Sequence, residues 1–358
     1  LFLYYCFSKM SLILWIKGLN PMEATSHSTW QAINLNQMMH LSKGLSAMQI
    51  RFGSLYSFIG HEKTLYIFCI FTEQRKTITF EADIVSLAIN SKHCLVLLAN
   101  GQLQKYDPLE ERLSCLNFLG IELDSINATK GSITHLACGE CITVACTSTN
   151  AIYNIPNLTT TLPKHVRIRK VVAGFEHCLM LTTNGDVYSW GGGLRGQLGN
   201  GEIVAVNDRP CVVNGLAGVK VIDIAADGWH SAAVSAFGDL YTWGWNNQGQ
   251  LGLQDPQHRE RVVSLPQLVS FSGEEDLMVE KVHCGIGHTV VEVVGVDRKK
   301  QVWCAGWNLE TRFTYSQASL SANFGGFRKL DGPVQGEAEQ LEVGAGSYQV
   351  YFLQRDQN

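Results

Sequence analysis

Short apolar stretches alternate with glycine-containing turns through the middle of the chain. Residues 177–181 are apolar, Asn184-Gly185 follows, and residues 187–190 are rich in aromatic and β-branched side chains. Asn-Gly between two such stretches is typical of a β-hairpin, whose two-residue turn needs positive φ at both central residues. Several glycines then permit tight backbone turns. The pattern therefore predicts consecutive antiparallel strands.

This unit occurs twice without a gap. Val171–Gly199 superposes on Ile224–Gly252 after a shift of 53 residues, and 11 of the 29 aligned pairs are identical. The identical pairs are Ala173/Ala226, His177/His230, Gly185/Gly238, Asp186/Asp239, Tyr188/Tyr241, Trp190/Trp243, Gly191/Gly244, Gly196/Gly249, Gln197/Gln250, Leu198/Leu251 and Gly199/Gly252. We expect Trp190 and Trp243 to pack between neighbouring repeats.

Weaker copies of the unit follow the same frame. The anchor position that His177 occupies is assigned to His93, Cys141, His177, His230, His288 and Ser347, with spacings of 48, 36, 53, 58 and 59 residues. A period near 50 residues combined with strand patterning indicates the blades of a β-propeller and argues against a helical solenoid. Six anchors predict six blades, and a seventh is sought between Pro108 and Ser132 or between Thr149 and His165.

The two ends of the chain are predicted to close the ring. The last repeat begins at Leu341 and lacks its outer strands, whereas residues 65–70 resemble residues 240–245. We therefore expect this N-terminal segment to complete the last blade, which removes exposed sheet edges. Residues 47–358 are predicted to form one propeller domain. Residues 1–46 are expected to be disordered, notably from Thr25 to Ser46, or to include sequence upstream of a true start at Met10 or Met22.

The repeat resembles that of the regulator of chromosome condensation family. The resemblance rests on Gly174-x-x-His177, on Tyr188-Ser189-Trp190-Gly191 with Gly196-Gln197-Leu198-Gly199, and on the second copy, Tyr241–Asn246 with Gly249–Gly252. It is strong over residues 166–310, with the best repeats at 166–252 and 280–310, and weak but in frame elsewhere. The resemblance implies an all-β closed propeller of four-stranded blades, seven in the family.

The same resemblance implies a protein-interaction scaffold without catalytic activity. Within the family, the well-formed middle repeats are similar to a small nuclear subfamily. That similarity implies a Jumonji-type 2-oxoglutarate oxygenase as partner, roles in chromatin state and chromosome segregation, and a nuclear location that extends to the cytoplasm. A guanine-nucleotide exchange factor for a Ran-type GTPase and a direct nucleosome binder are the alternatives. Neither a membrane nor a small-molecule substrate is expected, and the chain is expected to be monomeric.

Charge and cysteine content narrow these classes. There are 28 Lys and Arg against 32 Asp and Glu, a net charge of −4, whereas nucleic-acid binding by phosphate neutralisation needs an excess of basic residues. Residues 21–30 carry one acid and no Lys or Arg, so the basic tail through which the founding family member docks on nucleosomes is missing there. The odd number of 11 cysteines, several in apolar stretches, indicates buried reduced thiols rather than a disulfide framework.

Several local patterns have a structural interpretation. Gly191-x-Gly193-x-x-Gly196 matches a dinucleotide-binding fingerprint, but no amphipathic helix follows, so no cofactor is predicted. In the repeat frame Cys138 takes the place of Gly174 and Cys141 that of His177, so this Cys-x-x-Cys is not expected to bind metal. One histidine per repeat indicates a shared structural hydrogen bond. The predicted structural residues are His93, His177, Gly185, Trp190, Gly191, Gly196, Gly199, His230, Gly238, Trp243, Gly244, Gly249, Gly252, His288 and Gly306.

Two segments are candidates for partner contacts. A basic cluster, Lys164, His165, Arg167, Arg169 and Lys170, precedes the best repeat, and Arg167, Arg169 and Lys170 are the predicted contact or modification residues. In the resembled subfamily, arginines before this blade are plausible targets of the oxygenase. The alternative is a solvated strand edge. The second segment is the long excursion at 254–277, a loop of the kind that often carries recognition, or else a tolerated insertion.

Overall fold

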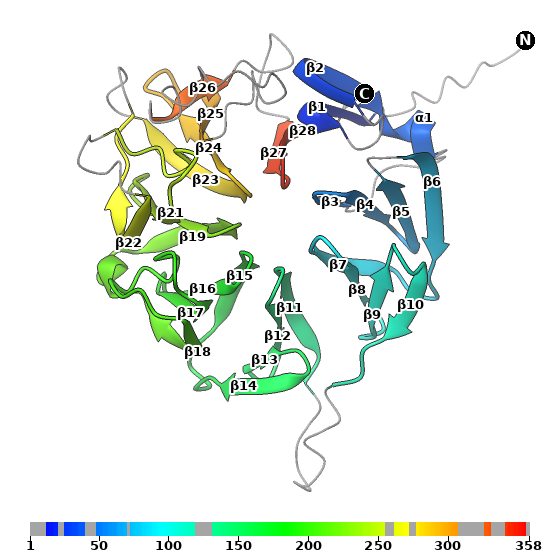
Figure 1. Cartoon of the computed structure of the whole chain (residues 1–358), viewed down its shortest axis with the longest axis horizontal. Helices are drawn as coiled ribbons and strands as arrows, with labels where there is room; N and C mark the ends of the chain where they lie inside the picture. Colours follow the sequence, from blue (N-terminus) through cyan, green and yellow to red (C-terminus); the bar gives the residue numbers. More distant parts are fainter. Residues whose placement is uncertain are drawn as a thin grey trace, which may run out of the picture.

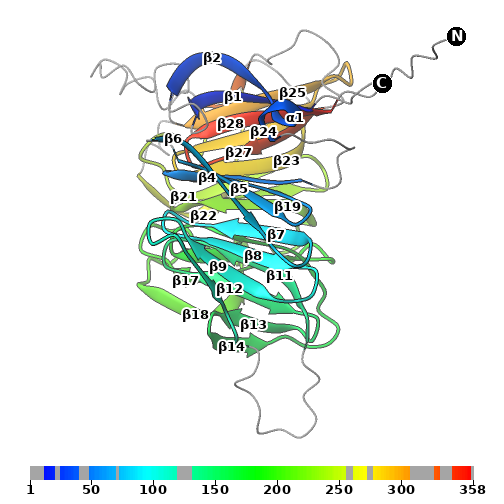
Figure 2. The ribbon, with the colours of Figure 1, turned by 90° about the vertical axis from the view of Figure 1, so that its right-hand side faces the viewer.

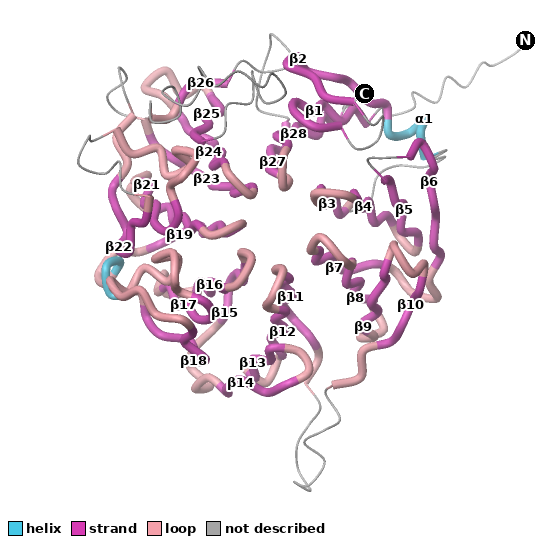
Figure 3. The backbone as a smooth tube through the Cα atoms, in the orientation of Figure 1, coloured by secondary structure: helices cyan, strands magenta, loops and turns pink. Residues whose placement is uncertain are grey.

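The described residues form seven four-stranded antiparallel sheets arranged as the blades of a closed ring. The computed structural model describes residues 12–20, 25–39, 48–69, 72–118, 131–254, 261–271, 277–306, 326–330 and 341–355. Figure 1 shows the ring along its axis, and Figure 2 shows the same blades stacked from the side. Strands and loops make up nearly all of the traced backbone in Figure 3. The prediction of a closed all-β propeller of six or seven four-stranded blades is confirmed, and the number is seven.

Each blade is numbered by its place along the chain, and its innermost strand is given first. Blade 1 contains β3 (Gln49–Phe52), β4 (Tyr56–His61), β5 (Thr64–Cys69) and β6 (Thr72–Thr79); blade 2 contains β7 (Ile84–Ile89), β8 (Cys94–Leu98), β9 (Leu103–Asp107) and β10 (Arg112–Cys115). Blade 3 contains β11 (Ile133–Cys138), β12 (Thr143–Thr147), β13 (Ala151–Asn154) and β14 (Asn157–Thr161); blade 4 contains β15 (Ile168–Ala173), β16 (His177–Thr182), β17 (Val187–Gly192) and β18 (Val206–Val212).

The remaining three blades follow the same order. Blade 5 contains β19 (Val221–Asp227), β20 (His230–Ser235), β21 (Leu240–Trp245) and β22 (Val262–Leu268). Blade 6 contains β23 (Met278–Gly285), β24 (His288–Val294), β25 (Lys300–Gly306) and β26 (Arg328–Leu330). Blade 7 contains β27 (Leu341–Ala345), β28 (Gln349–Arg355), β1 (Leu12–Asn20) and β2 (Thr25–Asn34), and a short helix, α1 (Leu35–Met39), follows β2.

The ring closes in blade 7, where strands from both ends of the chain form one sheet (Figure 1). β1 pairs with β28 from Leu12↔Arg355 to Gly18↔Gln349. The prediction of closure by an N-terminal strand is confirmed, but the predicted strand is wrong. Residues 65–69 belong to β5 of blade 1, and residue 70 lies outside the described residues.

The expectation of disorder over residues 1–46 is wrong wherever this part of the chain is described. Residues 12–20 and 25–34 are strands, and Leu14 and Ile16 are fully buried. A strand of this length needs only a few apolar side chains on one face, far fewer than a membrane span. β2 is the outermost strand of its sheet, so its sequence reads as polar and weakly patterned.

The unrecognised blade is blade 1, and neither predicted hiding place contains it. The segment 149–165 contains β13 and β14 of blade 3, and the described part of 108–132 contains β10 of blade 2. Blade 1 lacks the anchor histidine: Gly53 N–H donates to the carbonyl of Tyr56 (3.0 Å), as Gly174 N–H does to that of His177 (2.9 Å). The second strand of blade 1 therefore begins with a tyrosine, and a search for the anchor histidine does not detect this blade.

The same hydrogen bond corrects two predicted anchors. Gly139 N–H donates to the Ile142 carbonyl (2.7 Å), and Gly346 N–H donates to the Gln349 carbonyl (2.9 Å). Ile142 and Gln349, and not Cys141 and Ser347, therefore occupy the place of His177. Cys138 likewise lies one residue before the place of Gly174. Without a histidine or a Gly-x-x-His step to fix the frame, the sequence comparison had slipped by one and two residues.

The hairpin turn also differs from its prediction. Gly185 has φ of +98°, but Asn184 is not among the residues with positive φ. Gly185 N–H donates to the Thr182 carbonyl (3.1 Å), and Thr182 N–H donates to the Asp186 carbonyl (3.0 Å). This arrangement is a type I turn followed by a glycine bulge, which needs positive φ only at the glycine.

Candidate functional site

The recurrent histidines join neighbouring blades. His177, His230 and His288 are fully buried. Each Nε2 faces the next blade, at 2.8 Å from Ser231 Oγ, 2.9 Å from Thr289 Oγ1 and 3.3 Å from the Gln349 carbonyl, respectively. His93 differs, because its Nε2 lies 3.7 Å from the Cys138 sulfur. These positions give each histidine a partner in the following blade, which suits structural residues better than a catalytic centre.

The hydroxyl partners settle the tautomer of two histidines. Ser231 Oγ donates to the Gln197 carbonyl (2.9 Å), and Thr289 Oγ1 donates to the Gln250 carbonyl (2.7 Å). A hydroxyl has one proton to donate, so each hydroxyl accepts from the histidine. His177 and His230 therefore carry a proton on Nε2.

Burial keeps these two imidazole rings neutral at pH values well below the usual pKa of histidine. Loss of solvent lowers the pKa of His177 to about 3 and that of His230 to about 4. The charged form cannot be hydrated in the interface between blades. Burial acts in the opposite direction on Asp227, at the end of β19, and raises the pKa of its carboxyl to about 7.

These shifts predict that the fold is less stable in mild acid. The contribution of the two histidines is complete above about pH 6.5 and is lost as the pH falls towards their folded pKa values. Asp227 opposes this trend, because the folded state holds its proton up to about pH 7. Because the unfolded chain gains two histidine protons in this range and the folded chain holds one carboxyl proton, stability falls on the net as the pH decreases from 6 to 5.

Urea unfolding at pH 7, 6 and 5 measures this dependence. His230→Asn is expected to flatten it, because one histidine then balances Asp227, whereas Asp227→Asn is expected to make it steeper. An identical pH dependence in wild type and both variants would show that these groups do not control acid stability.

The repeated glycines lie where the backbone needs positive φ. Gly244 has φ of +102°, and the same conformation recurs at Gly191 and Gly306. A Cβ at Gly244 would lie 2.5 Å from the Trp229 carbonyl, which is closer than van der Waals contact allows. The fingerprint Gly191-x-Gly193-x-x-Gly196 lies between two strands, β17 and β18, and not at the start of a helix.

Trp190 and Trp243 pack between blades as expected. Trp190, in β17 of blade 4, lies among side chains of blade 3 that include Val144 and Ile152. Trp243, in β21 of blade 5, lies among side chains of blade 4 that include Leu179. The two tryptophans are at most 2% exposed.

The Cys-x-x-Cys segment has unequal cysteines. Burial raises the pKa of Cys138 to about 11, and Cys141 is exposed. Both are free thiols, and no group of His, Cys, Asp or Glu suited to a metal ion was found within the described residues.

The innermost strands of all seven blades line a central channel. The cavity has a volume of about 310 Å³, and residues such as Arg51, Lys170, Asp227 and His283 contribute to its wall. The equivalent position of each innermost strand, seven residues before the anchor, carries a polar residue: Gln49, Ser86, His135, Lys170, Asp223, Lys281 and Glu342. Of these seven residues, Lys170 is among those that line the cavity.

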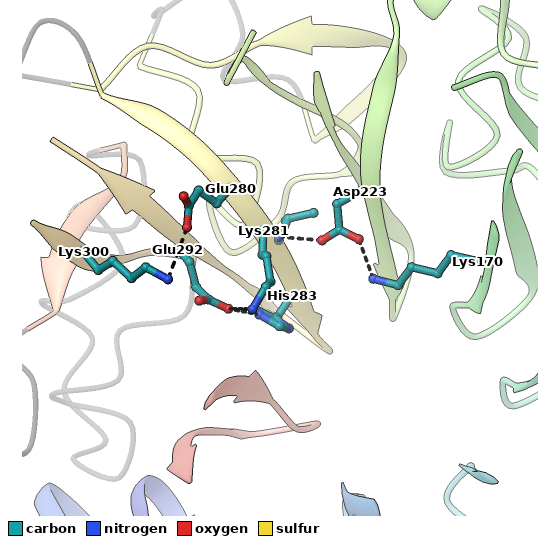
Figure 4. Close-up of polar contacts among 8 residues, drawn as sticks. Lys170, Asp223, Glu280, Lys281, His283, Glu292 and Lys300 are labelled. Atoms are coloured by element: carbon teal, nitrogen blue, oxygen red, sulfur yellow. Dashed lines mark hydrogen bonds and ion pairs between the residues drawn. The ribbon is translucent and has the colours of Figure 1, made fainter. Parts of the chain in front are cut away.

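An ion pair connects blade 4 to blade 5, and a hydrogen bond connects blade 5 to blade 6, close to the channel (Figure 4). Lys170 Nζ lies 2.7 Å from Asp223 Oδ1, and Asp223 Oδ2 accepts a hydrogen bond from the Val282 backbone N–H at 3.1 Å. Behind them, Glu292 lies 3.4 Å from Lys281 and 3.1 Å from His283. Burial raises the pKa of Glu292, but His283 and Lys281 outweigh it, so this carboxyl has a lowered pKa.

Asp223, Lys281, His283 and Glu292 are not among the residues predicted from the sequence. A usable signal exists: in blades 2 to 6 the polar residue directly follows a β-bulge at a constant distance from the anchor. With correct anchors, this column of polar residues can be found by aligning the repeats.

One residue of the predicted basic cluster forms an ion pair, and the other residues are exposed. Lys164, His165, Arg167 and Arg169 are exposed, whereas Lys170 is half-buried and paired with Asp223. The Arg167 carbonyl accepts a hydrogen bond from Thr183 N–H (2.8 Å), and the bulge between Ile168 and Lys170 accommodates Arg169. The backbone is held by the sheet at the start of β15, while both arginine side chains are exposed to solvent.

The second predicted segment is only partly described. Residues 255–260 and 272–276, with most of its charged side chains, lie outside the described residues. Between them runs β22, the outer strand of blade 5, and the Arg261 carbonyl accepts a hydrogen bond from Asn246 N–H at 2.8 Å. The part that can be placed is therefore a strand and not an open loop.

Among the described helices, none has the length and apolarity to cross a membrane.

The ring of seven four-stranded blades, with its recurrent Gly-His and Trp-Gly positions, defines a β-propeller built from sequence repeats. Family models described as "Regulator of chromosome condensation (RCC1) repeat" match residues 184–234 and 238–291, and a related model of the same description matches residues 168–197. Within residues 168–291 the chain therefore matches the RCC1 repeat.

The chain is similar to RCC1 domain-containing protein 1. It is 43% identical to that of Mus musculus over 237 residues, which covers 55% of this chain and 59% of the relative. It is 47% identical to that of Homo sapiens over 92 residues, which covers 26% and 24%. A match to the E3 ubiquitin-protein ligase HERC2 of Homo sapiens is 43% identical over 127 residues and covers 35% of this chain and 2% of the relative. The chain thus spans less than two thirds of each of these relatives.

Solved structures share the complete fold. Human WBSCR16 superposes with a TM-score of 0.69 at 13% identity, over 97% of this chain and 99% of that chain. Yeast RCC1 (Prp20), solved with Kap60, superposes with a TM-score of 0.67 at 16% identity, over 98% and 89%. At these identities the likeness concerns the fold alone.

Proposed function

We propose that the chain is a non-catalytic nuclear adaptor that binds a Jumonji-type 2-oxoglutarate oxygenase and acts in chromatin state and chromosome segregation. The observation that carries this proposal is the pair of exposed arginines, Arg167 and Arg169, on a backbone held by blade 4. A fixed backbone lowers the ordering cost of binding, and Arg is enriched among residues that dominate interface energies. The similarity to RCC1 domain-containing protein 1 supports the choice of partner class.

The proposed contact lies at one mouth of the channel. Arg167 and Arg169 are exposed, and the adjacent Lys170 is paired with Asp223 at 2.7 Å, which ties this part of β15 to blade 5. An acidic surface or the substrate cleft of an oxygenase would complement this patch. The same geometry presents either arginine as a target for modification by the bound enzyme.

Affinity measurement with a purified Jumonji-type oxygenase tests the proposal. Arg167→Gln combined with Arg169→Gln is expected to weaken binding about 30-fold, which corresponds to a loss of about 2 kcal/mol. Arg328→Gln, at an exposed arginine on β26 of blade 6, is the matched control and is expected to bind like wild type. Equal affinity of the double variant and the control would refute the contact.

Two alternative functions have distinct outcomes. An exchange factor accelerates nucleotide release from a Ran-type GTPase, and an adaptor does not. A nucleosome binder loses affinity steeply with added salt. Prp20p of Saccharomyces cerevisiae, whose crystal structure shares this fold, has binding properties to Gsp1p and histones. Nucleotide release and nucleosome titration with this chain therefore accompany the affinity experiment, and a positive result in either would replace the adaptor proposal.

A further inference from the structure

A second pocket lies between blades 3 and 4, at the opposite end of the strands from Arg167 and Arg169. It has a volume of about 550 Å³, and its wall includes Trp190, Glu176 and Leu158. β15 runs from Ile168, which pairs with Thr182, to Ala173, which pairs with Cys178 beside Trp190. The pocket and the basic mouth are therefore separate surfaces of blade 4.

The indole nitrogen of Trp190 is unsatisfied in this pocket. Trp190 is 2% exposed, and its Nε1 is shielded from solvent without a hydrogen-bond partner in the described residues. The equivalent Trp243 shows what is missing, because its Nε1 donates to the Gln197 carbonyl at 2.9 Å. A buried donor without an acceptor costs free energy, so the pocket is poised to receive an acceptor.

The difference between the two tryptophans comes from the preceding blade. Gln197 belongs to the loop 193–205 between β17 and β18, which covers the interface with blade 5. In blade 3 the corresponding connection between β13 and β14 is two residues, Ile155 and Pro156. Blade 3 therefore has no loop equivalent to residues 193–205, and the pocket lies beside its short connection, with Asn154 and Asn157 in the wall.

The residue that follows the anchor histidine also differs between blade 4 and blades 5 and 6. Ser231 and Thr289, which follow the anchor histidines, donate to loop carbonyls. Blade 4 has Cys178 at that position, and its sulfur lies 3.1 Å from the carbonyl of Val172 in its own blade. Blade 4 therefore lacks the hydroxyl that would donate to a loop of the preceding blade, and that loop is absent, but blade 4 keeps its tryptophan, Trp190.

Charge specifies the occupant further. In the covered interface, Arg195 of the loop stacks on Trp229, the residue before the anchor, at 4.1 Å from the ring centroid. The residue before the anchor of blade 4 is Glu176, which lines the pocket. Its only described ion pair, with Arg195, spans 3.8 Å. Arg195 lies over the indole ring of Trp229 in blade 5. An arginine placed in the same way over blade 4 would meet the carboxylate of Glu176 instead of an indole ring.

We propose that this pocket binds a glycine-rich turn of a partner protein, which supplies an arginine to Glu176 and a backbone carbonyl to Trp190 Nε1. The turn takes the place of the loop that blade 3 lacks. The internal loop gives the expected pattern, Leu-Arg-Gly-Gln-Leu-Gly, as in residues 194–199. This surface is additional to the oxygenase contact and does not depend on it.

A head-to-tail cyclised peptide containing Leu-Arg-Gly-Gln-Leu-Gly, titrated into the full chain, tests the proposal. The indole N–H signal of Trp190, assigned by its loss in Trp190→Phe, is expected to shift on binding, whereas that of Trp243 stays in place. Trp190→Phe is expected to weaken binding about fivefold, since it removes one hydrogen bond and keeps the aromatic ring.

A double-mutant cycle tests the charge pair. Glu176→Gln and an Arg→Ala change in the peptide are each expected to weaken binding about threefold to tenfold, and the two together no more than one alone. Glu202→Gln, an exposed acid outside the pocket, is the control and is expected to bind like wild type.

Arg167→Gln with Arg169→Gln is expected to leave peptide binding unchanged, so the two proposals fail independently. The turn proposal is overturned if the peptide leaves the Trp190 signal of the wild-type chain unmoved at millimolar concentration. It is equally overturned if Trp190→Phe and Glu176→Gln both bind like wild type.

Discussion

Removal of residues 1–34 is expected to prevent the propeller from folding cooperatively. β1 and β2 supply half of blade 7, and their side chains Leu14, Ile16 and Ile33 are at most 8% exposed. Each such side chain contributes about 1.5–3 kcal/mol on burial, so together they are comparable with the whole stability of a typical domain, about 5–15 kcal/mol. The deletion also leaves β28 as an unpaired edge. Circular dichroism and calorimetric melting measure the effect.

Two further samples sharpen this test. Removal of residues 1–11 alone leaves both strands and is expected to melt like the complete chain. A synthetic peptide of residues 12–34, added to the chain that lacks residues 1–34, is expected to restore a cooperative transition by pairing with β28. A truncated chain that melts at the wild-type temperature without the peptide would show that blade 7 does not need these strands.

Trp243→Ala is expected to destabilise the protein by about 3–5 kcal/mol, the usual range for a buried tryptophan. Trp243 is fully buried against blade 4 and donates to the Gln197 carbonyl. The substitution leaves a cavity between two blades and removes a donor from that carbonyl. Urea unfolding monitored by circular dichroism gives the change in free energy.

Two comparisons separate these contributions. Phe237→Ala, at a side chain that is 82% exposed, is expected to change stability by no more than about 0.5 kcal/mol. Trp190→Ala is expected to cost less than Trp243→Ala, because it creates a cavity but also removes an unsatisfied donor. Equal costs at Trp190 and Trp243 would contradict the importance of the Gln197 hydrogen bond.

Blades could be identified from the sequence wherever a recurrent residue is required for a backbone conformation or a hydrogen bond. Gly244 needs positive φ, and His230 must reach the next blade, so both are restricted in type and can be recognised. In blades 1, 3 and 7 the anchors are Tyr56, Ile142 and Gln349, which no single pattern covers. Those blades were missed or shifted because a strand tolerates many residue types.

The candidate sites divide in the same way. The exposed basic stretch around Arg167 and Arg169 could be identified from local sequence, because its charges are adjacent in the chain. The pair of Lys170 with Asp223 spans 53 residues, and its geometry depends on how two blades are placed side by side. The pocket at Trp190 was invisible to sequence analysis, since it results from a short connection in the preceding blade.

By itself, the sequence determined the all-β class, the repeat, its family resemblance and the closure of the ring from its N-terminal side. These properties follow from glycines with positive φ, from alternating strands and from a period near 50 residues, all of which are local or strictly periodic. Only the tertiary structure decided which strands close blade 7, where the missing blade lies and which side chains face one another across blades. Those features depend on pairing between segments far apart in the chain, whose partners are selected by the packing of the complete ring.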